Sequence, residues 1–529
     1  ARAFKKAPRQ IAEALLAHLP ALENSIFSKA EIAGPGFINL FLSPAWFSSV
    51  VYGATLNGQY GRTGYGGGEA VNVECVSANP TGPMHLGNAR GGALGDCLAA
   101  VLDWAGYNVT REFYVNDAGN QIQKFGKSLS ARYLQLYQGE EAVPFPEDGY
   151  QGPDVIANAK SFAELYGDKY VNVPSEERKA ALIGYALPKN IQGLHDDLLR
   201  YRVEYDNWFK ESTLHENGAV GRVVELLKEK GATYEKDGAT WFESTKHGDD
   251  KDRVIIKSDG NYAYFAADIA YYRNKRHRKT DPADVAIYML GADHHGYIGR
   301  MMAMCAAFGD KPGENMQILI GQMVNVMKDG KPVRMSKRAG NIVTIDDLID
   351  AIGVDASRYS LARTDYNSPV DIDLNLLASH SNDNPVYYVQ YAHARSCNVD
   401  RNAEAAQINA ADADLSLLDT EADGEVIAAL AQWPALLTLA GDLRAPHRIA
   451  HYLEDLAAAY HKWYNVERVV PMPLTEAEER ADEQTRERTR IAKNPEPARA
   501  AARLKLNDAV QTVIAEGLDL LGVTAPDKM

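Results

Sequence analysis

The stretch SANPTGPMHLGNARGGALGD, residues 77–96, narrows the possible folds of this 529-residue chain more than any other segment. It places two prolines, a histidine and two asparagines between two apolar segments. Before it, Val71, Val73 and Cys75 alternate with polar residues, which is the period of a β-strand with one buried face. After it, apolar residues recur at helical spacing as far as Gly106. The pattern predicts a strand, a tight loop and a helix in succession.

A second strand pattern follows that helix, over residues 109–115. A strand, a helix and a strand in this order form the unit of a parallel sheet, whose ligands bind at the carboxyl ends of the strands. His85 and Asn88 fall where the helix begins, and the unpaired backbone N–H groups of a helix N-terminus attract an anion. The sequence therefore predicts an α/β Rossmann-like domain with a phosphate site at residues 85–88.

Two other phosphate-binding loops fit this chain poorly. A dinucleotide fingerprint needs a glycine where Ala89 stands. The GKS at residues 126–128 lacks the first glycine of a P-loop, because Gln121 occupies that position. We make no prediction from either pattern.

Charge and cysteine content narrow the class of protein. A formal net charge of −15 argues against binding nucleic acid through overall charge, but it leaves room for a local basic face. Residues 271–279, YYRNKRHRK, could form one, although a solvated helix end is the simpler interpretation. The four cysteines form no CxxC pair, so we expect a cytoplasmic protein with no disulfide framework and no bound metal. We identify no apolar run of membrane-spanning length and expect no membrane association.

A second loop complements the first. A strand pattern runs into Asp329-Gly330, which is a strong signal for a two-residue hairpin turn. Three cations follow within five residues: Arg334, Lys337 and Arg338. Such closely spaced cations repel one another unless an anion lies between them. A polyphosphate would meet this requirement.

Together the two loops resemble a known enzyme class. HLGN at residues 85–88 and RMSKR at residues 334–338 are similar to the HIGH and KMSKS signatures of class I aminoacyl-tRNA synthetases. The resemblance implies that His85 and Asn88 donate hydrogen bonds to phosphate oxygens during adenylation, and that Lys337 holds the β- and γ-phosphates of ATP. The residues that it implies for ATP binding are Pro83, His85, Gly87, Asn88, Arg334, Met335, Ser336, Lys337 and Arg338.

Two positions depart from the signatures. Asn88 stands where the HIGH pattern has its second histidine, so this position offers N–H donors without a charge. Arg334 stands where KMSKS has its first lysine, so the charge is kept on a planar group. Lys337 is present, and adenylation requires positioned donors rather than an enzyme nucleophile, so we expect the activity to be retained.

Three longer stretches resemble arginyl-tRNA synthetases of bacterial type: residues 73–90, 384–395 and 521–529. The resemblance spans essentially the whole chain. It implies that L-arginine and ATP form arginyl-adenylate, that the arginyl group passes to the 3′ end of arginine tRNA, and that activation depends on tRNA. Mg²⁺ would accompany ATP, with no tightly bound cofactor, and we expect a monomer. The residues implied for arginine binding are Asn39, Glu74, Ser77, Asn79, His85, Tyr264, Asp268 and His294.

An arginine ligand agrees with the residue types in this set. A guanidinium is always charged, so its pocket needs carboxylates such as Glu74 and Asp268. Each has a structural alternative: Glu74 could face solvent, and Asp268 could pair with Arg273. His294, with Asp293 and His295, could instead bind a metal, but no third ligand lies at a telling spacing.

The resemblance also predicts three parts of the chain. Residues 1–65 would be an additional tRNA-binding domain that is incomplete at its start. Residues 69–380 would be the catalytic domain, with a helix-rich insertion at about 125–250. Residues 384–529 would be an all-helical anticodon-binding domain, joined through a mobile connector at residues 403–423. The residues expected to contact tRNA are Tyr387, Tyr388, Gln390, Tyr391 and Arg395.

Three other functions compete with this one. Another class I synthetase, such as one for cysteine, is disfavoured because zinc-ligating cysteines are lacking and carboxylates occupy the expected pocket. A small-molecule nucleotidyltransferase with an HxGH-like loop would leave the long helical domain without a purpose. A non-catalytic tRNA-binding relative would be expected to have lost His85, Asn88 or Lys337, and all three are present.

Overall fold

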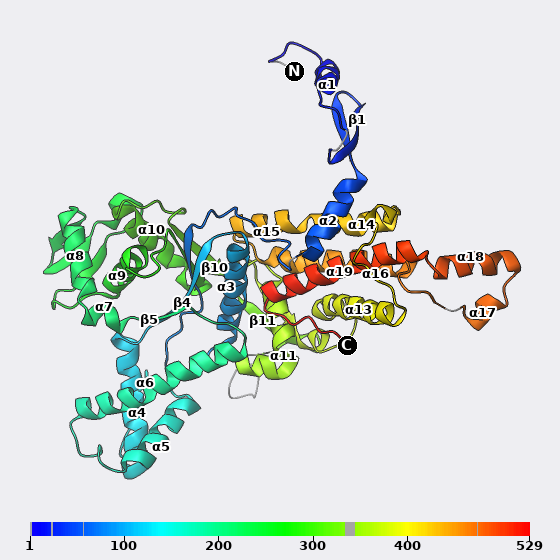
Figure 1. The fold of residues 1–529 in the computed structure, drawn as a ribbon. Helices are drawn as coiled ribbons and strands as arrows, with labels where there is room; N and C mark the ends of the chain where they lie inside the picture. The colour runs from blue at the N-terminus through cyan, green and yellow to red at the C-terminus, as the bar shows by residue number, and fades with distance from the viewer. Residues whose placement is uncertain (1–2, 23–24, 57, 334–343, 473) are drawn as a thin grey trace.

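A computed structural model gives the fold, and it describes residues 3–22, 25–56, 58–333, 344–472 and 474–529. A small N-terminal region, a central α/β region and a C-terminal helical region follow one another along the chain (Figure 1). The N-terminal hairpin projects from the body, and a three-helix arm projects from the opposite side (Figure 1).

The central sheet has five parallel strands in the order β10-β9-β3-β4-β5. They are β3 (Ala70–Glu74), β4 (Asn108–Val115), β5 (Asn207–Lys210), β9 (Val285–Gly291) and β10 (Met316–Gly321). Helix α3 (Leu86–Trp104) connects β3 to its parallel neighbour β4. The strand, helix and strand unit predicted from the sequence period is thereby confirmed.

Helices cover both faces of this sheet. On one face α3 and α11 (Ile345–Ala362) share a core with Val71 and Val73. On the other face α9 (Tyr264–His277) and α10 (Ile298–Ala307) pack against β9. The expectation that β3 has one solvated face is therefore wrong: Asn72 and Glu74 are only 0% and 5% exposed. Polar side chains on a strand buried from both sides need buried partners.

A second sheet carries the predicted hairpin. It has the order β12-β11-β13, with β11 (Val324–Lys328), β12 (Lys331–Pro332) and β13 (Val370–Asp373). Asp329 and Gly330 have φ values of +52° and +69°, which a two-residue hairpin turn of this kind requires. Thr344 caps α11, because its hydroxyl accepts a hydrogen bond from the Asp347 N–H at 3.1 Å. The short helix α12 (Leu374–Leu377) follows β13.

The predicted insertion proves to be two separate structures. Helices α4 (Gly119–Gln138), α5 (Pro153–Tyr166) and α6 (Ser175–Arg200) form the projecting arm, which has its own core (Figure 1). β5 then pairs with β4, so a single insertion over about 125–250 is wrong. A strand of four residues is too short for its period to be recognised.

After β5 the chain builds a smaller subdomain. It consists of α7 (Ser212–Glu216), α8 (Ala219–Glu229), β6 (Thr233–Lys236), β7 (Ala239–Phe242), the 3₁₀ turn η1 (Ser244–His247) and β8 (Arg253–Ile256). β6, β7 and β8 form an antiparallel sheet. A further 3₁₀ turn, η2 (Ala292–Tyr297), follows β9 directly.

The N-terminal region is attached through one helix. It contains α1 (Pro8–Ala17), β1 (Phe27–Ala33), β2 (Phe37–Leu42) and α2 (Pro44–Leu56). β1 and β2 form a hairpin, and α2 packs against the C-terminal helices. The hairpin therefore lies far from the central sheet (Figure 1).

The C-terminal region is helical, as predicted. Its elements are α13 (Pro385–Ala405), η4 (Leu415–Leu417), α14 (Glu421–Ala431), α15 (Trp433–Asp442), α16 (His447–Val466), α17 (Glu476–Glu479), α18 (Glu483–Lys493) and α19 (Pro497–Leu520). The expected mobile connector at 403–423 is wrong in part, because Leu415 and Leu418 are buried in the core. The acidic composition of residues 403–423 made these two buried leucines hard to identify from the sequence.

Glu421–Asp442 is long and apolar enough to span a membrane by length and composition, although no such segment was expected from the sequence. The segment is divided into α14 and α15, and Trp433 and Leu437 are fully buried in the core shared with α3. Core helices of soluble proteins meet the same criterion.

Candidate active site

The loop between β3 and α3 is held in a strained conformation. Val76 and Ser77 have φ values of +69° and +43°, which lie in the left-handed region that β-branched residues rarely adopt. The Ser77 hydroxyl accepts a hydrogen bond from the Tyr114 N–H at 3.1 Å, which ties the loop to β4. The chain therefore leaves β3 along a fixed path toward residue 85.

His85 and Asn88 form the N-terminus of α3. His85 is the N-cap residue, and its ring is exposed. The Asn88 side-chain oxygen accepts a hydrogen bond from the His85 N–H at 3.0 Å. This bond uses the acceptor of the Asn88 amide and leaves its two N–H donors for a ligand. An added Cβ at Gly87 would meet nothing within 4 Å, so the space in front of the helix is open.

The chain that follows the predicted basic loop lies beside this helix N-terminus. Arg334, Met335, Ser336, Lys337 and Arg338 lie outside the described residues. Before them, the Val333 N–H donates to the Val326 carbonyl at 2.8 Å. After them, Thr344 forms an antiparallel bridge with His85, and the Ile345 N–H donates to the Met84 carbonyl at 3.2 Å. The chain that leaves the basic segment is thus joined to the HLGN loop.

Asp268, Glu211 and Glu74 all lie near the carboxyl edge of the sheet. Asp268 lies on α9, and burial, followed by the charges of Glu211 and Glu74, raises its pKa to about 7. Glu211 directly follows β5 and is 5% exposed, and burial raises its pKa as well. Glu211 was not recognised in the sequence. Its position immediately after a strand of the central sheet would have been the signal, had β5 been predicted.

Glu74 has a buried partner. Its carboxylate accepts a hydrogen bond from the Lys275 ammonium group at 2.6 Å, and Lys275 also donates to the Asn72 side-chain oxygen at 2.7 Å. Lys275 is fully buried, and Arg278 pairs with Glu112 on the adjacent strand. The solvent-facing alternative for Glu74 is therefore wrong, and so is the solvated-end interpretation of residues 271–279.

The remaining predicted arginine-binding residues differ in position. Tyr264 lies one helical turn before Asp268, and its hydroxyl accepts from the Asn120 N–H at 3.0 Å. His294 is exposed on η2, directly after β9. Asn79 is exposed in the loop after β3. All three stand at the carboxyl side of the sheet. Asn39 does not, because it lies exposed on β2 in the projecting hairpin.

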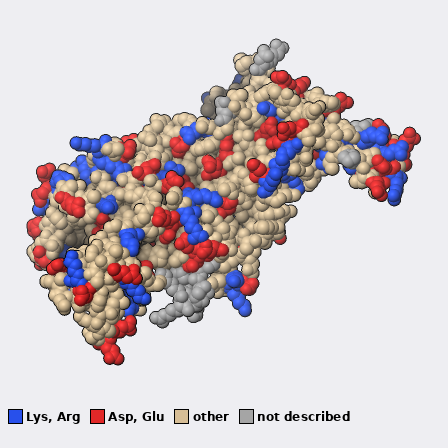
Figure 2. Space-filling model, turned by 60° about the horizontal axis from the view of Figure 1, so that its bottom comes forward, with Lys and Arg blue, Asp and Glu red and all other residues tan. Residues whose placement is uncertain are grey.

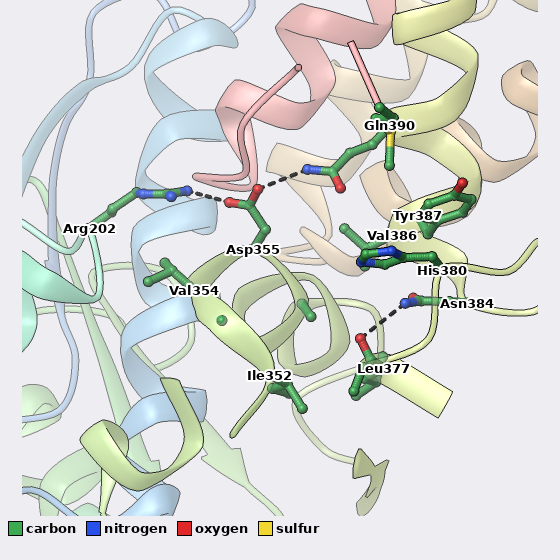
Figure 3. Close-up of a pocket in the computed structure, with 14 residues that line it drawn as sticks. Arg202, Ile352, Val354, Asp355, Leu377, His380, Asn384, Val386, Tyr387 and Gln390 are labelled. Atoms are coloured by element: carbon green, nitrogen blue, oxygen red, sulfur yellow. Dashed lines mark hydrogen bonds and ion pairs between the residues drawn. The ribbon is translucent and has the colours of Figure 1, made fainter. Parts of the chain in front are cut away.

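The predicted tRNA-contacting residues are grouped on and beside α13. The rings of His380 and Tyr387 are stacked, with centroids 5.6 Å apart, and Tyr387 is stacked on Tyr391 at 6.0 Å. The Arg395 guanidinium lies 4.7 Å from the centroid of the Tyr391 ring, and Tyr388 contacts His461 edge to face. His380 and Tyr387, at one end of this ladder of rings, line a cavity of about 330 Å³ (Figure 3).

Comparisons with known proteins decide the family. Family models match as follows: "Arginyl tRNA synthetase N terminal domain" at residues 1–42, "tRNA synthetases class I (R), catalytic domain" at residues 56–147 and 187–377, and "DALR anticodon binding domain" at residues 389–529. An arginine–tRNA ligase of Bifidobacterium animalis subsp. lactis is 69% identical, and the match covers 99% of this chain and 89% of the relative.

The chain belongs to the arginyl-tRNA synthetase family. A second relative, the arginine–tRNA ligase of Bifidobacterium adolescentis, is 63% identical over 99% of this chain and 89% of its own length. The arginyl-tRNA synthetase structure from Thermus thermophilus has a TM-score of 0.71 and 21% identity, covering 100% of this chain and 93% of that one. This likeness shows a common fold. The family and fold class predicted from the sequence are confirmed.

Within this arginyl-tRNA synthetase fold, one predicted tRNA contact has a structural role. Gln390 is 9% exposed, and its amide donates to Asp355 at 2.8 Å and to the Thr524 carbonyl at 2.9 Å. Figure 3 shows Gln390 pointing toward Asp355 rather than outward. It ties α13 to α11 and to the C-terminal tail, so Gln390 is not presented to a nucleic acid.

The surface of this family member carries mixed charge. On the face shown in Figure 2, basic and acidic side chains are interspersed and form no single basic surface. The alternative of a metal site at Asp293, His294 and His295 is also unsupported, since these residues form no group of converging ligands within the described part of the chain.

Proposed function

We propose that the chain is an arginine–tRNA ligase that activates L-arginine with ATP and transfers it to the 3′ end of arginine tRNA. Membership of the family and 69% identity to an arginine–tRNA ligase support this activity. One structural feature carries the choice of amino acid: Asp268 on α9 and Glu211 at the end of β5 both lie on the carboxyl side of the sheet, near enough that the charge of Glu211 raises the pKa of Asp268. Such a pocket suits a guanidinium.

For adenylation, we propose that the arginine carboxylate attacks the α-phosphorus of ATP. His85 and the amide donors of Asn88 would bind the phosphoryl oxygens on which charge develops. Lys337, with Arg334 and Arg338, would hold the β- and γ-phosphates and the departing pyrophosphate. Pro83, Gly87, Met335 and Ser336 would shape the ATP site. Mg²⁺ would accompany ATP and neutralise part of its charge.

For arginine recognition, Asp268 would pair with the guanidinium, and Tyr264 would offer its ring face or its hydroxyl. Glu211 would add a second negative charge near Asp268. Glu74 would act indirectly, because Lys275 already neutralises it. Ser77, Asn79 and His294 remain predicted contacts at the mouth of the pocket. Asn39 lies too far from this edge to be retained.

For tRNA, we propose that Tyr387, Tyr388, Tyr391 and Arg395 form a platform for unpaired bases. Aromatic rings and guanidinium planes bind bases by stacking, which needs little overall positive charge. Dependence of activation on tRNA, a cytoplasmic location and a monomeric state stay predictions.

Exchange of pyrophosphate into ATP tests this function, with each amino acid in turn and with and without tRNA. Exchange with arginine alone, and only when tRNA is present, is the expected result. Exchange with a different amino acid would support a class I synthetase but would contradict the assignment of an arginine pocket. Absence of exchange with every amino acid would contradict the ligase.

A further inference from the structure

A group of metal-ligating side chains lies outside the active site, between α13 and the C-terminal tail. His393 and Cys397 are one helical turn apart on α13, and Asp527 comes from the tail. One ligand atom of each lies within 4.8 Å of the others. Cys397 Sγ is 3.8 Å from Asp527 Oδ1 and 4.0 Å from His393 Nε2.

We propose that His393, Cys397 and Asp527 bind a divalent transition-metal ion of the zinc type, with water as the fourth ligand. Metal–ligand bonds of about 2.0–2.3 Å in a tetrahedral site place neighbouring ligand atoms about 3.3–3.8 Å apart. The sulfur–oxygen separation of 3.8 Å lies in this range, and the other two separations, which are within 4.8 Å, would shorten when the ion binds. Sulfur, imidazole and carboxylate ligands in combination suit zinc better than magnesium or calcium.

The surroundings of His393 favour this role. His393 Nδ1 lies 3.0 Å from the Pro526 carbonyl, which can only accept, so the proton is on Nδ1 and the lone pair on Nε2 points elsewhere. A metal-binding imidazole is commonly oriented by such a bond to a backbone carbonyl. Since Pro526 precedes Asp527, the tail supplies both this orienting group and a ligand.

Cys397 can supply a thiolate when the ion binds. Without an ion the Cys397 thiol donates to Asp527 Oδ1 at 3.8 Å. Binding forms the metal–sulfur bond and releases that proton to solvent, with no change of oxidation state. The Gln511 amide lies 2.7 Å from the sulfur and donates to it, which stabilises the negative charge.

The ion would fasten the tail to the first helix of the anticodon-binding region. The tail already contacts two helices. The Thr524 N–H donates to Asp355 on α11 at 3.2 Å, and Arg401 on α13 donates to the Asp527 carbonyl at 3.2 Å. The last residue, Met529, borders the cavity beside Tyr387. A bound ion would therefore order the tail next to the proposed base-binding platform.

Cobalt titration of the metal-free full chain tests the site. Co²⁺ is expected to bind one per chain, with a sulfur-to-cobalt charge-transfer band and the visible bands of a tetrahedral site, and Zn²⁺ should remove both. Cys397→Ser should abolish the charge-transfer band, and Asp527→Asn should weaken Co²⁺ binding at least tenfold. The matched control is Cys305→Ser, because Cys305 is also buried but lies on α10.

A charge-transfer band that is absent, that persists in Cys397→Ser, or that disappears in Cys305→Ser would overturn the proposal. If Cys397→Ser does not fold, Asp527→Asn decides, since this exposed residue can be changed without opening the core. Unaltered Co²⁺ affinity in Asp527→Asn would then exclude the site. A rise in melting temperature on adding Zn²⁺ that Asp527→Asn loses gives a second, independent readout.

Discussion

At the scale of single residues, Asp268 is expected both to bind arginine and to destabilise the folded chain when it is ionised. Burial and the charges of Glu211 and Glu74 raise its pKa to about 7. Because this pKa exceeds that in the unfolded chain, the free energy of unfolding contributed by Asp268 is fully present at low pH and is lost as the pH rises through 7. Arginine requires the ionised form, so its affinity should increase over the same pH range.

Asp268→Asn should separate these two effects. We expect it to raise the free energy of unfolding at about pH 8 by roughly 1 kcal/mol or more, since the amide has no charge to bury. Arginine binding should weaken by about 100-fold or more, with ATP binding retained. Calorimetric titration and denaturant unfolding measure both, and Asp237→Asn, at an exposed carboxylate in the turn between β6 and β7, is the matched control. Arginine affinity that survives Asp268→Asn would contradict the pocket assignment.

A substitution at Asn88 can separate its role in capping the N-terminus of α3 from its proposed role in catalysis. Asn88→Asp keeps an oxygen that can accept from the His85 N–H, so the helix should remain capped and stability should be nearly unchanged. The carboxylate has no N–H donors and repels phosphate, so we expect pyrophosphate exchange to fall by about 100-fold or more. Steady-state rates with arginine affinity measured in parallel provide the check. An active Asn88→Asp enzyme would show that these donors do not bind the phosphates.

At the scale of elements, the buried end of α9 stabilises the sheet. Lys275→Met should leave the Glu74 carboxylate without its cation, whereas Glu112 keeps its ion pair with Arg278. Unpaired buried carboxylates typically lower the free energy of unfolding by about 3–5 kcal/mol. Urea unfolding measures this, with Lys279→Met, at an exposed lysine, as the comparison. Equal stability of the two variants would mean that the ion pairs contribute nothing net.

Some elements could be predicted from the sequence and others could not. The β3-α3-β4 unit and the hairpin at Asp329-Gly330 were predictable, because their periods and turn residues are local signals. β5 was missed because four residues show no period, and with it Glu211 was missed. The basic run at 271–279 was misinterpreted because its carboxylate partners are on strands more than 150 residues away in the chain.

At the scale of the whole molecule, Arg358 joins the catalytic and helical regions. It is fully buried on α11, and its guanidinium donates to the Leu521 carbonyl at 2.8 Å, the Arg202 carbonyl at 2.8 Å and Asp96 at 2.6 Å. The two regions also share one apolar core. Removing residues 384–529 would expose the apolar face of α3 and α11, so point substitutions are the better test of how the regions cooperate.

Arg358→Met should therefore weaken both regions together. We expect the free energy of unfolding to fall by about 3–5 kcal/mol, because the carbonyls and Asp96 lose buried donors. Arginine binding and tRNA charging should decline at the same urea concentration. Arg499→Met, at a partly exposed ion pair with Asp419, should change little. Loss of tRNA charging well before arginine binding would show that the regions unfold independently.

Helix α3 carries His85 at one end, and at its other end Ala105 and Leu102 lie against Gly441 of α15. A Cβ at Gly441 would lie 3.4 Å from the Ala105 side chain, which is van der Waals distance, so α15 packs directly against this end of α3. Helix α3, which has 19 residues and is about 28 Å long, thus contacts both the HLGN loop and the C-terminal helical region. Over evolutionary time, the two regions are therefore constrained to change together. A chimaera with a relative's anticodon-binding region would need the matching outer face of α3 as well.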